Sequence, residues 1–228
     1  MFWMMDKYYI ILVLPAIILS VWAQTKVNGT FKKYSQVHSS RQITGADVAT
    51  RLLRAYGITD VRVERVAGNL SDHFDPRAMV IRLSDSVYNA TSVAAIGVAA
   101  HETGHAIQHH LGYKPIRIRN VFVPVANIGS MLAIPLVIIG LIASIPSLSV
   151  AGIILFSAVV AFQLVTLPVE FNASRRAIRV LDEQGILEQD ELKGAKKVLS
   201  AAAMTYVAAA AVAIGNLLRL VMLTRDRD

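Results

Sequence analysis

Four long apolar stretches, none of which contains a charged side chain, constrain this chain of 228 residues more than any other feature. An α-helix needs about 20 consecutive apolar residues to cross the hydrocarbon core of a bilayer, and three of the stretches come close to that length. The chain is 54% hydrophobic, which is more than a soluble domain usually contains. The pattern predicts a mainly α-helical membrane protein with about four transmembrane helices and the lipid bilayer as a partner. The stretches lie at 8–23, 121–143, 150–167 and 198–218.

The first stretch has two interpretations. The residues at 21–23, Val-Trp-Ala, would suit the cleavage site of a secretory signal peptide. Against this, Lys26, Lys32 and Lys33 follow the stretch, and positive charge after a span favours a retained anchor with its N-terminus outside. We therefore expect the first span to be retained.

Positive charge predicts the rest of the topology. Residues 24–120 contain 13 Lys and Arg against 7 Asp and Glu, and further basic residues flank the later stretches, whereas the connector 144–149 has no charge. Positively charged loops stay in the cytoplasm, so we expect a multi-pass protein of the inner or plasma membrane with both termini outside. The net charge of +7 is then explained by this bias and by anionic lipid headgroups, and it requires no nucleic acid.

The polar segments indicate a small α+β domain on the cytoplasmic side. We expect a helix from Thr44 to about Tyr56, strands at 61–66 and 78–83 in a hairpin-like sheet, a turn or long loop at 68–76, and a helix from Ser92 towards Gly112. The expected organisation is transmembrane helix 1 at 1–23, the cytoplasmic domain at 24–120, a transmembrane hairpin at 121–168, a cytoplasmic segment at 169–197, transmembrane helix 4 at 198–218 and a polar tail at 219–228.

Residues 101–105 read His-Glu-Thr-Gly-His and carry the most specific chemistry in the chain. Histidines four residues apart lie on one face of a helix, where both imidazoles can reach a single Zn²⁺. Glu102 then lies beside the metal, where it can hold a water and accept its proton. Because the chain has no cysteine, disulfides and thiolate metal sites are excluded. The sequence predicts a zinc site of the HExxH type.

A catalytic zinc site usually has three protein ligands and one open position. Glu170 is our choice for the third, because a carboxylate at a membrane boundary is costly unless it is paired or ligating; pairing with a nearby arginine is the alternative. Ser174 would lie on the same helix face as Glu170. The other candidates for the third ligand are His73, Gln108, His109 and His110.

Two of these candidates also suit other roles. Gln108 more plausibly hydrogen-bonds the substrate or a ligating histidine, since amides bind zinc poorly. His73 lies in the cluster Asp72-His73-Phe74-Asp75-Pro76, which forms either an Asx-type turn or a group that polarises the scissile carbonyl or orients a ligand.

Three strings in the chain resemble the bacterial YugP-like neutral zinc metallopeptidases: 72–76, 98–108 and 170–177. The resemblance covers nearly the whole chain and implies a membrane-bound peptidase. A more distant similarity joins the chain to HtpX-like and CAAX-prenyl-protease membrane peptidases, whose third zinc ligand is the Glu of a Glu-x-x-Ala-Asp motif. That Glu falls on Glu170, whereas the Asp falls on Ser174, which departs from the motif.

These observations predict a zinc-dependent metalloendopeptidase. His101, His105 and Glu170 would hold Zn²⁺ with water in the fourth position, and Glu102 would move the proton from that water to the leaving amine. In HExxH proteases the edge of a strand before the metal helix accepts the substrate backbone, and 78–83 is either that strand or an ordinary structural one. We expect peptide or membrane-protein substrates. The alternatives are a catalytically silent zinc-binding scaffold or regulator and, ranked last, a zinc transporter.

Overall fold

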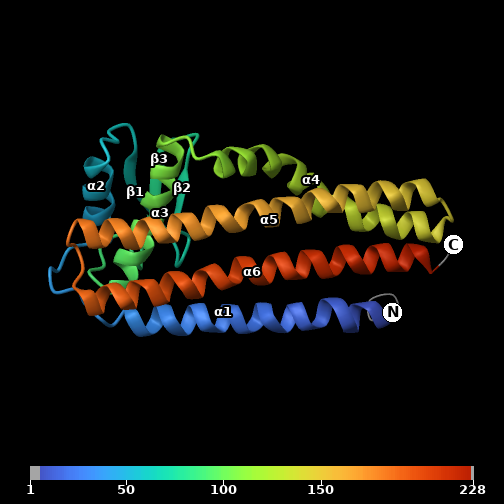
Figure 1. Cartoon of the computed structure of the whole chain (residues 1–228), viewed down its shortest axis with the longest axis horizontal. Coiled ribbons are helices and arrows are strands. Elements are labelled where there is room, and N and C mark those ends of the chain that lie inside the picture. The colour runs from blue at the N-terminus through green and yellow to red at the C-terminus, as the bar shows by residue number, and fades with distance from the viewer. Residues whose placement is uncertain (1–5, 227–228) are drawn as a thin grey trace. The chain divides into compact units, whose positions relative to one another are not determined.

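The computed structural model describes residues 6–226 and consists mostly of helices (Figure 1). Residues 1–5 of the expected first span and residues 227–228 of the expected tail lie outside the described part. Within the described residues, one π-helical turn, η2, and six α-helices accompany three short strands. The elements are η2 Tyr9–Val13, α1 Leu14–Tyr34, α2 Gly45–Ala55, β1 Arg62–Val66, β2 His73–Asp75, β3 Val80–Ser84, α3 Val93–His110, α4 Lys114–Ile142, α5 Pro146–Glu183 and α6 Gln189–Arg225.

Four of the described helices are long and apolar enough to cross a membrane: Tyr9–Tyr34, Lys114–Ile142, Pro146–Glu183 and Gln189–Arg225. They cover the four apolar stretches to within one residue, and each extends beyond at least one end of its stretch. The helix that contains the first stretch continues through the polar region after residue 23 as far as Tyr34. Lysine and glutamine are good helix formers, so loss of apolar character there does not end the helix.

Two compact units divide the described residues between them. One takes the chain up to Gln24, Arg117–Pro168 and the chain from Met204 onward, and the other takes Thr25–Ile116 and Val169–Ala203. The first is built around apolar side chains of α4, α5 and α6, including Val137, Phe156 and Leu220. The second has a larger apolar core, drawn from α2, α3, the sheet and parts of α5 and α6, and it contains every residue of the candidate site.

The sheet of the second unit differs from the expected hairpin. Its strand order is β1-β3-β2; β1 pairs with β3 in parallel, and β2 pairs with β3 antiparallel. The segment 68–76, expected as a turn or long loop, contains β2, so the chain reverses direction twice between β1 and β3. Asp72 holds this segment in place, since its carboxylate accepts hydrogen bonds from the Ser84 backbone N–H (2.7 Å) and hydroxyl (2.9 Å).

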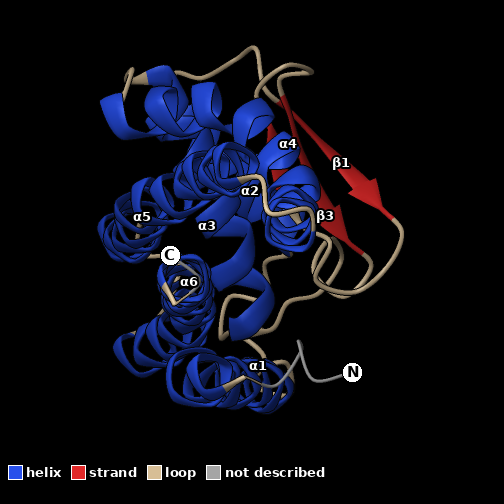
Figure 2. Cartoon of the chain, turned by 90° about the vertical axis from the view of Figure 1, so that its right-hand side faces the viewer, coloured by secondary structure: helices blue, strands red, loops and turns tan. Residues whose placement is uncertain are grey.

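The strand order also corrects the expected substrate edge. The segment 78–83 contributes to β3, which is the central strand, and both of its edges are already paired. The outer strands are β1 and β2. Figure 2 shows the strands gathered beside α2 and α3, and β2 contacts α3 through the Phe74 and His109 rings, whose centroids are 5.8 Å apart.

The two short helices of this unit begin and end as predicted. The Thr44 side chain accepts a hydrogen bond from the Asp47 N–H at the start of α2, and Gly57 follows its end with a φ of +68°. Ser92 caps α3 in the same way, and Gly112 follows that helix with a φ of +62°. Side-chain oxygens at the first position and glycine in the left-handed region after the last turn are common helix boundaries.

Several contacts tie the first span to α6 within the first unit. Asp6 and Arg219 form an ion pair at 2.7 Å, and Tyr8 donates a hydrogen bond to Asp226 at 2.8 Å. A Cβ at Gly215 would lie 2.5 Å from the Leu12 carbonyl oxygen, so the two backbones approach closely there. Ala23, the last residue before the considered cleavage point, is fully buried within α1. These contacts pack the first span against α6.

The close approach at Gly215 predicts that Gly215→Ala destabilises the protein by about 1–3 kcal/mol, because the added methyl group would force α6 away from Leu12. Gly29→Ala is the control: a Cβ there meets nothing within 4 Å, and alanine is favoured over glycine in a helix by about 0.5–1 kcal/mol. Thermal unfolding in detergent micelles measures both. An equal effect of the two substitutions would contradict the packing of η2 against α6.

Candidate metal centre

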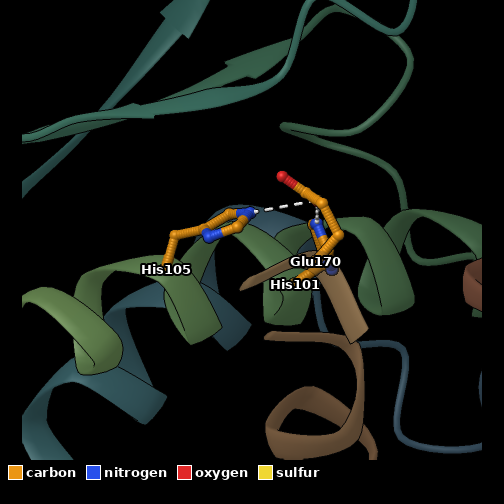
Figure 3. A group of neighbouring side chains, drawn as sticks. All are labelled: His101, His105 and Glu170. Carbon is orange, nitrogen blue, oxygen red and sulfur yellow. Dashed lines mark ion pairs between the residues drawn. The ribbon is translucent and has the colours of Figure 1, made fainter. Parts of the chain in front are cut away.

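Helix α3 presents His101 and His105 on one face, because four residues span slightly more than one helical turn. Their ring centroids are 4.7 Å apart. Glu170, on α5, points between them, and its Oε2 atom lies 3.3 Å from Nε2 of His101 and 3.5 Å from Nε2 of His105 (Figure 3). One ring nitrogen of each histidine and one carboxylate oxygen all lie within 4.8 Å of one another. Residues 69 positions apart in the sequence thus converge on one point.

The approach of α3 to α5 brings these residues together. A Cβ at Gly104 would lie 2.8 Å from the Ala173 carbonyl oxygen, which is closer than any side chain there allows. Ala173 and Ala177 are themselves buried, with 0% and 1% of their surface exposed. Small residues on both helices therefore permit the backbone contact that places Glu170 opposite the histidines.

The second ring nitrogen of each histidine is also engaged. Nδ1 of His105 lies 3.0 Å from Oε1 of Gln108, and Nδ1 of His101 lies 3.2 Å from Oγ of Ser174. Histidines that bind metals usually use their other ring nitrogen in this way, which orients the ring. In both residues the Nε2 atom is the one that faces Glu170.

The donor set fits a zinc ion. Two imidazole nitrogens and one carboxylate oxygen are a ligand set that zinc favours, and here the three atoms are already gathered at a buried point with 2% of Glu170 exposed. The His101, His105 and Glu170 cluster could therefore hold a metal ion.

Glu102 lies beside this cluster and is also buried, with 8% of its surface exposed. Burial raises the pKa of its carboxyl group to about 7, and the nearby Glu170 and Asp72 charges act in the same direction. His101 and a hydrogen bond with the Phe74 backbone oppose that rise. A carboxylate with a pKa near neutrality is suited to taking up and releasing a proton.

The structure places Asp72 near the site and His73 away from it. Burial raises the pKa of Asp72, although its hydrogen bonds with Ser84 oppose the change. Nδ1 of His73 hydrogen-bonds the Ser71 carbonyl at 2.8 Å, and its Nε2 lies 3.4 Å from a guanidinium nitrogen of Arg82. His73 thus lies with Arg82, while its neighbour Phe74 contacts His109.

The remaining candidates for the third ligand are not part of the cluster of possible ligands found among the described residues. Gln108 contacts His105 instead, His109 packs against Phe74, and His110 is exposed.

Asn172 and Arg176 lie near the site, and neither was predicted from the sequence as a site residue. Asn172 accepts hydrogen bonds from Gln108 (2.9 Å) and from Arg176 (2.7 Å). The available signal was their helical spacing: Asn172 lies two residues after Glu170 and one turn before Arg176. That spacing alone could not indicate which atom of α3 they would meet.

A comparison with protein families agrees with this geometry. The family described as "Putative neutral zinc metallopeptidase" matches residues 9–225. The chain belongs to this family. A relative in Bacillus subtilis (strain 168), named "Putative membrane protease YugP", is 49% identical over 215 residues, which cover 94% of this chain and 96% of the relative. No solved structure matches the chain.

Membership of this family and the four membrane-length helices support the predicted class of membrane zinc peptidase. The resemblance stated from the sequence is confirmed, because both the family and the Bacillus relative are the ones it indicated.

The α3–α5 contact predicts that Gly104→Ala lowers the free energy of unfolding by about 1–3 kcal/mol and weakens metal binding, since the methyl group would push Ala173 and Glu170 away from the histidines. Gly97→Ala is a matched control on the same helix, because a Cβ there makes only ordinary contact with Ala195, at 3.4 Å. Unfolding curves with and without added zinc measure both variants. A Gly104→Ala protein as stable and as responsive to zinc as Gly97→Ala would contradict the role of this contact in the site.

Proposed function

We propose that the protein is a zinc-dependent metalloendopeptidase that cleaves peptide bonds close to the cytoplasmic surface of the membrane. The observation that carries the proposal is the convergence of His101, His105 and Glu170 beside the buried carboxylate of Glu102. Family membership supports the same reaction class.

In each of the three proposed ligands, the structure indicates which atom would bind zinc. His101 and His105 would hold zinc through Nε2, since their Nδ1 atoms contact Ser174 and Gln108, and Glu170 would hold it through its carboxylate. When bound, zinc supplies Lewis-acid chemistry, polarising a carbonyl oxygen and lowering the pKa of a water.

Glu102 performs the proton transfers in this proposal. Its carboxylate accepts a proton from the water that attacks the peptide carbonyl carbon. It then donates that proton to the amide nitrogen as the C–N bond breaks, which releases a free amine and a carboxylic acid. Its position next to His101 and its burial support this role. Burial keeps bulk water away from the carboxylate, so the proton that it accepts is available for the leaving amine.

The outer strand β2 is the best-placed element to hold a substrate. It is a sheet edge, it contacts α3 through Phe74 and His109, and the Phe74 backbone reaches Glu102. An extended peptide added beside an outer strand gains main-chain hydrogen bonds with little dependence on its sequence. This assigns to β2 the role that the sequence suggested for 78–83.

The charge pattern supports a location in the plasma or inner membrane with the site on the cytoplasmic side. Basic residues dominate 24–120, the segment that carries the motif, and the connector 144–149 has none. Glu170 follows an apolar stretch by three residues. Membrane proteins, or segments emerging next to the bilayer, are therefore the proposed substrates.

Replacing the proposed base separates catalysis from metal binding. Glu102→Gln should retain zinc and lose about 10²–10⁴-fold in peptidase rate, because the amide cannot accept the proton. Glu170→Ala should lose zinc and activity together. Metal analysis and cleavage of a quenched peptide by detergent-purified protein measure both.

The exposed Glu188 provides a matched control, since Glu188→Gln should change neither zinc content nor rate. Full activity in zinc-loaded Glu102→Gln would contradict the mechanism. Zinc bound by a wild-type protein that cleaves no peptide would favour the silent scaffold.

The proposed substrate class predicts a preference for anchored peptides. In proteoliposomes, a peptide attached to a transmembrane anchor should be cleaved about 10²-fold faster than the same peptide free in solution, because anchoring raises its effective concentration at the site. Glu102→Gln proteoliposomes control for contaminating proteases. Equal rates for the two peptides would contradict a membrane-proximal substrate.

A further inference from the structure

We propose that Arg176, Asn172 and Gln108 form a hydrogen-bond chain that holds His105 with a proton on Nδ1, so that its Nε2 lone pair is directed at the metal position. Gln108 and Asn172 are then positioning residues, and the proposal rests on the metal centre of the proposed function. The direction of each hydrogen bond in this chain is fixed, because at least one of its two groups can only donate or can only accept.

The chain begins at Arg176, whose guanidinium only donates hydrogen bonds. Its Nε lies 2.7 Å from the side chain of Asn172, one turn earlier on α5. The Asn172 atom that faces it must therefore be the carbonyl oxygen Oδ1. Arg176 is itself positioned against the ring of Tyr113, with its guanidinium carbon 6.0 Å from the ring centroid.

The Asn172 oxygen in turn orients Gln108. One end of the fully buried Gln108 amide lies 2.9 Å from Oδ1 of Asn172 and 2.8 Å from the Val169 carbonyl oxygen. Both partners are acceptors, so this end must be the NH₂ group, and both of its protons are used. Rotating the amide by 180° would place an oxygen against two oxygens, which burial makes costly.

The other end of the amide sets the state of His105. Oε1 of Gln108 lies 3.0 Å from Nδ1 of His105 and can only accept a hydrogen bond. Nδ1 must therefore carry the proton. In the neutral ring this leaves Nε2 without a proton, and Nε2 is the atom that faces Glu170 at 3.5 Å.

His101 has no such constraint. Its Nδ1 contacts Ser174 at 3.2 Å, and a hydroxyl group can rotate to donate or to accept. The two histidines are therefore unequal: His105 is set in advance by three side chains, whereas His101 adapts. Pre-orienting one ligand reduces the ordering cost of binding the ion.

The test uses full-length protein labelled with ¹⁵N-histidine, together with two substitutions at Asn172 that keep the number of side-chain heavy atoms. Asn172→Asp keeps oxygen acceptors for Gln108 and Arg176, whereas Asn172→Leu removes one of the two acceptors that orient the Gln108 amide and leaves the Val169 carbonyl oxygen. Nitrogen-15 NMR of the metal-free protein reports which ring nitrogen of His105 carries the proton, and competition with a chelator measures zinc affinity.

In wild type and Asn172→Asp we expect the Nδ1–H form of His105 and equal zinc affinity. In Asn172→Leu we expect the Nε2–H form to appear and zinc affinity to fall about 10–100-fold, the usual effect of losing such a partner. Gln108→Met, which removes the acceptor itself, should act similarly. A purely structural role would not move the proton between ring nitrogens in a folded variant.

Wild-type protein with the proton on Nε2 would overturn the proposal without any variant. So would Asn172→Leu with an unchanged tautomer and unchanged zinc affinity. Because the tautomer is read without metal, the two proposals can fail separately. An Nδ1–H His105 in a protein that binds no zinc would reject the metal centre alone, and zinc binding with the proton on Nε2 would reject the chain alone.

Discussion

The backbone contact between α3 and α5 is the constraint on which the site depends. Two histidines on one helix offer only two ligands, and the third group must come from elsewhere in the chain. Glycine at 104 lets the Ala173 carbonyl approach to a distance that no side chain would permit. Glu170, one turn away on α5, is thereby carried to within 3.5 Å of both Nε2 atoms. Packing and ligand geometry are thus parts of one arrangement.

Different polar side chains around the site orient the histidines and hold the neighbouring strand in place. Ser174 and Gln108 occupy the Nδ1 atoms of the histidines, which leaves the Nε2 atoms facing inward. Asp72 joins the segment before β2 to Ser84 on β3, and this places the Phe74 backbone beside Glu102. The buried carboxylate of Glu102 is therefore bordered by α3 on one side and by an outer strand on the other.

Much of this could be predicted from local patterns. Charge-free apolar stretches indicated the four long helices, Thr44 and Gly57 marked the bounds of α2, and the spacing of His101 and His105 indicated a shared face. Glu170 was predicted from the cost of an unpaired carboxylate next to an apolar span, and the structure brings it to the histidines. In each case the interaction that determines the structure is between residues close in sequence, or between one residue and the surrounding solvent or lipid.

The predictions were wrong or incomplete where contacts between residues far apart in the sequence determine the structure. Only three residues form β2, and their place in the sheet depends on the Asp72–Ser84 hydrogen bonds across 12 positions. Without β2, the segments 61–66 and 78–83 would form a two-stranded hairpin, in which each strand is a sheet edge. Likewise, helical spacing placed Asn172 near Arg176 but could not show that Gln108 of α3 would meet it 64 positions away.

The most direct test of the central claim is X-ray absorption at the zinc edge of the purified, zinc-loaded protein. A centre formed by His101, His105 and Glu170 predicts two imidazole ligands with oxygen completing a four-coordinate shell at about 2.0–2.2 Å. Glu170→Ala should lose the signal or alter its oxygen shell. Three imidazole ligands would show that another histidine completes the site. That result, or a spectrum that Glu170→Ala leaves unchanged, would contradict a centre built on Glu170.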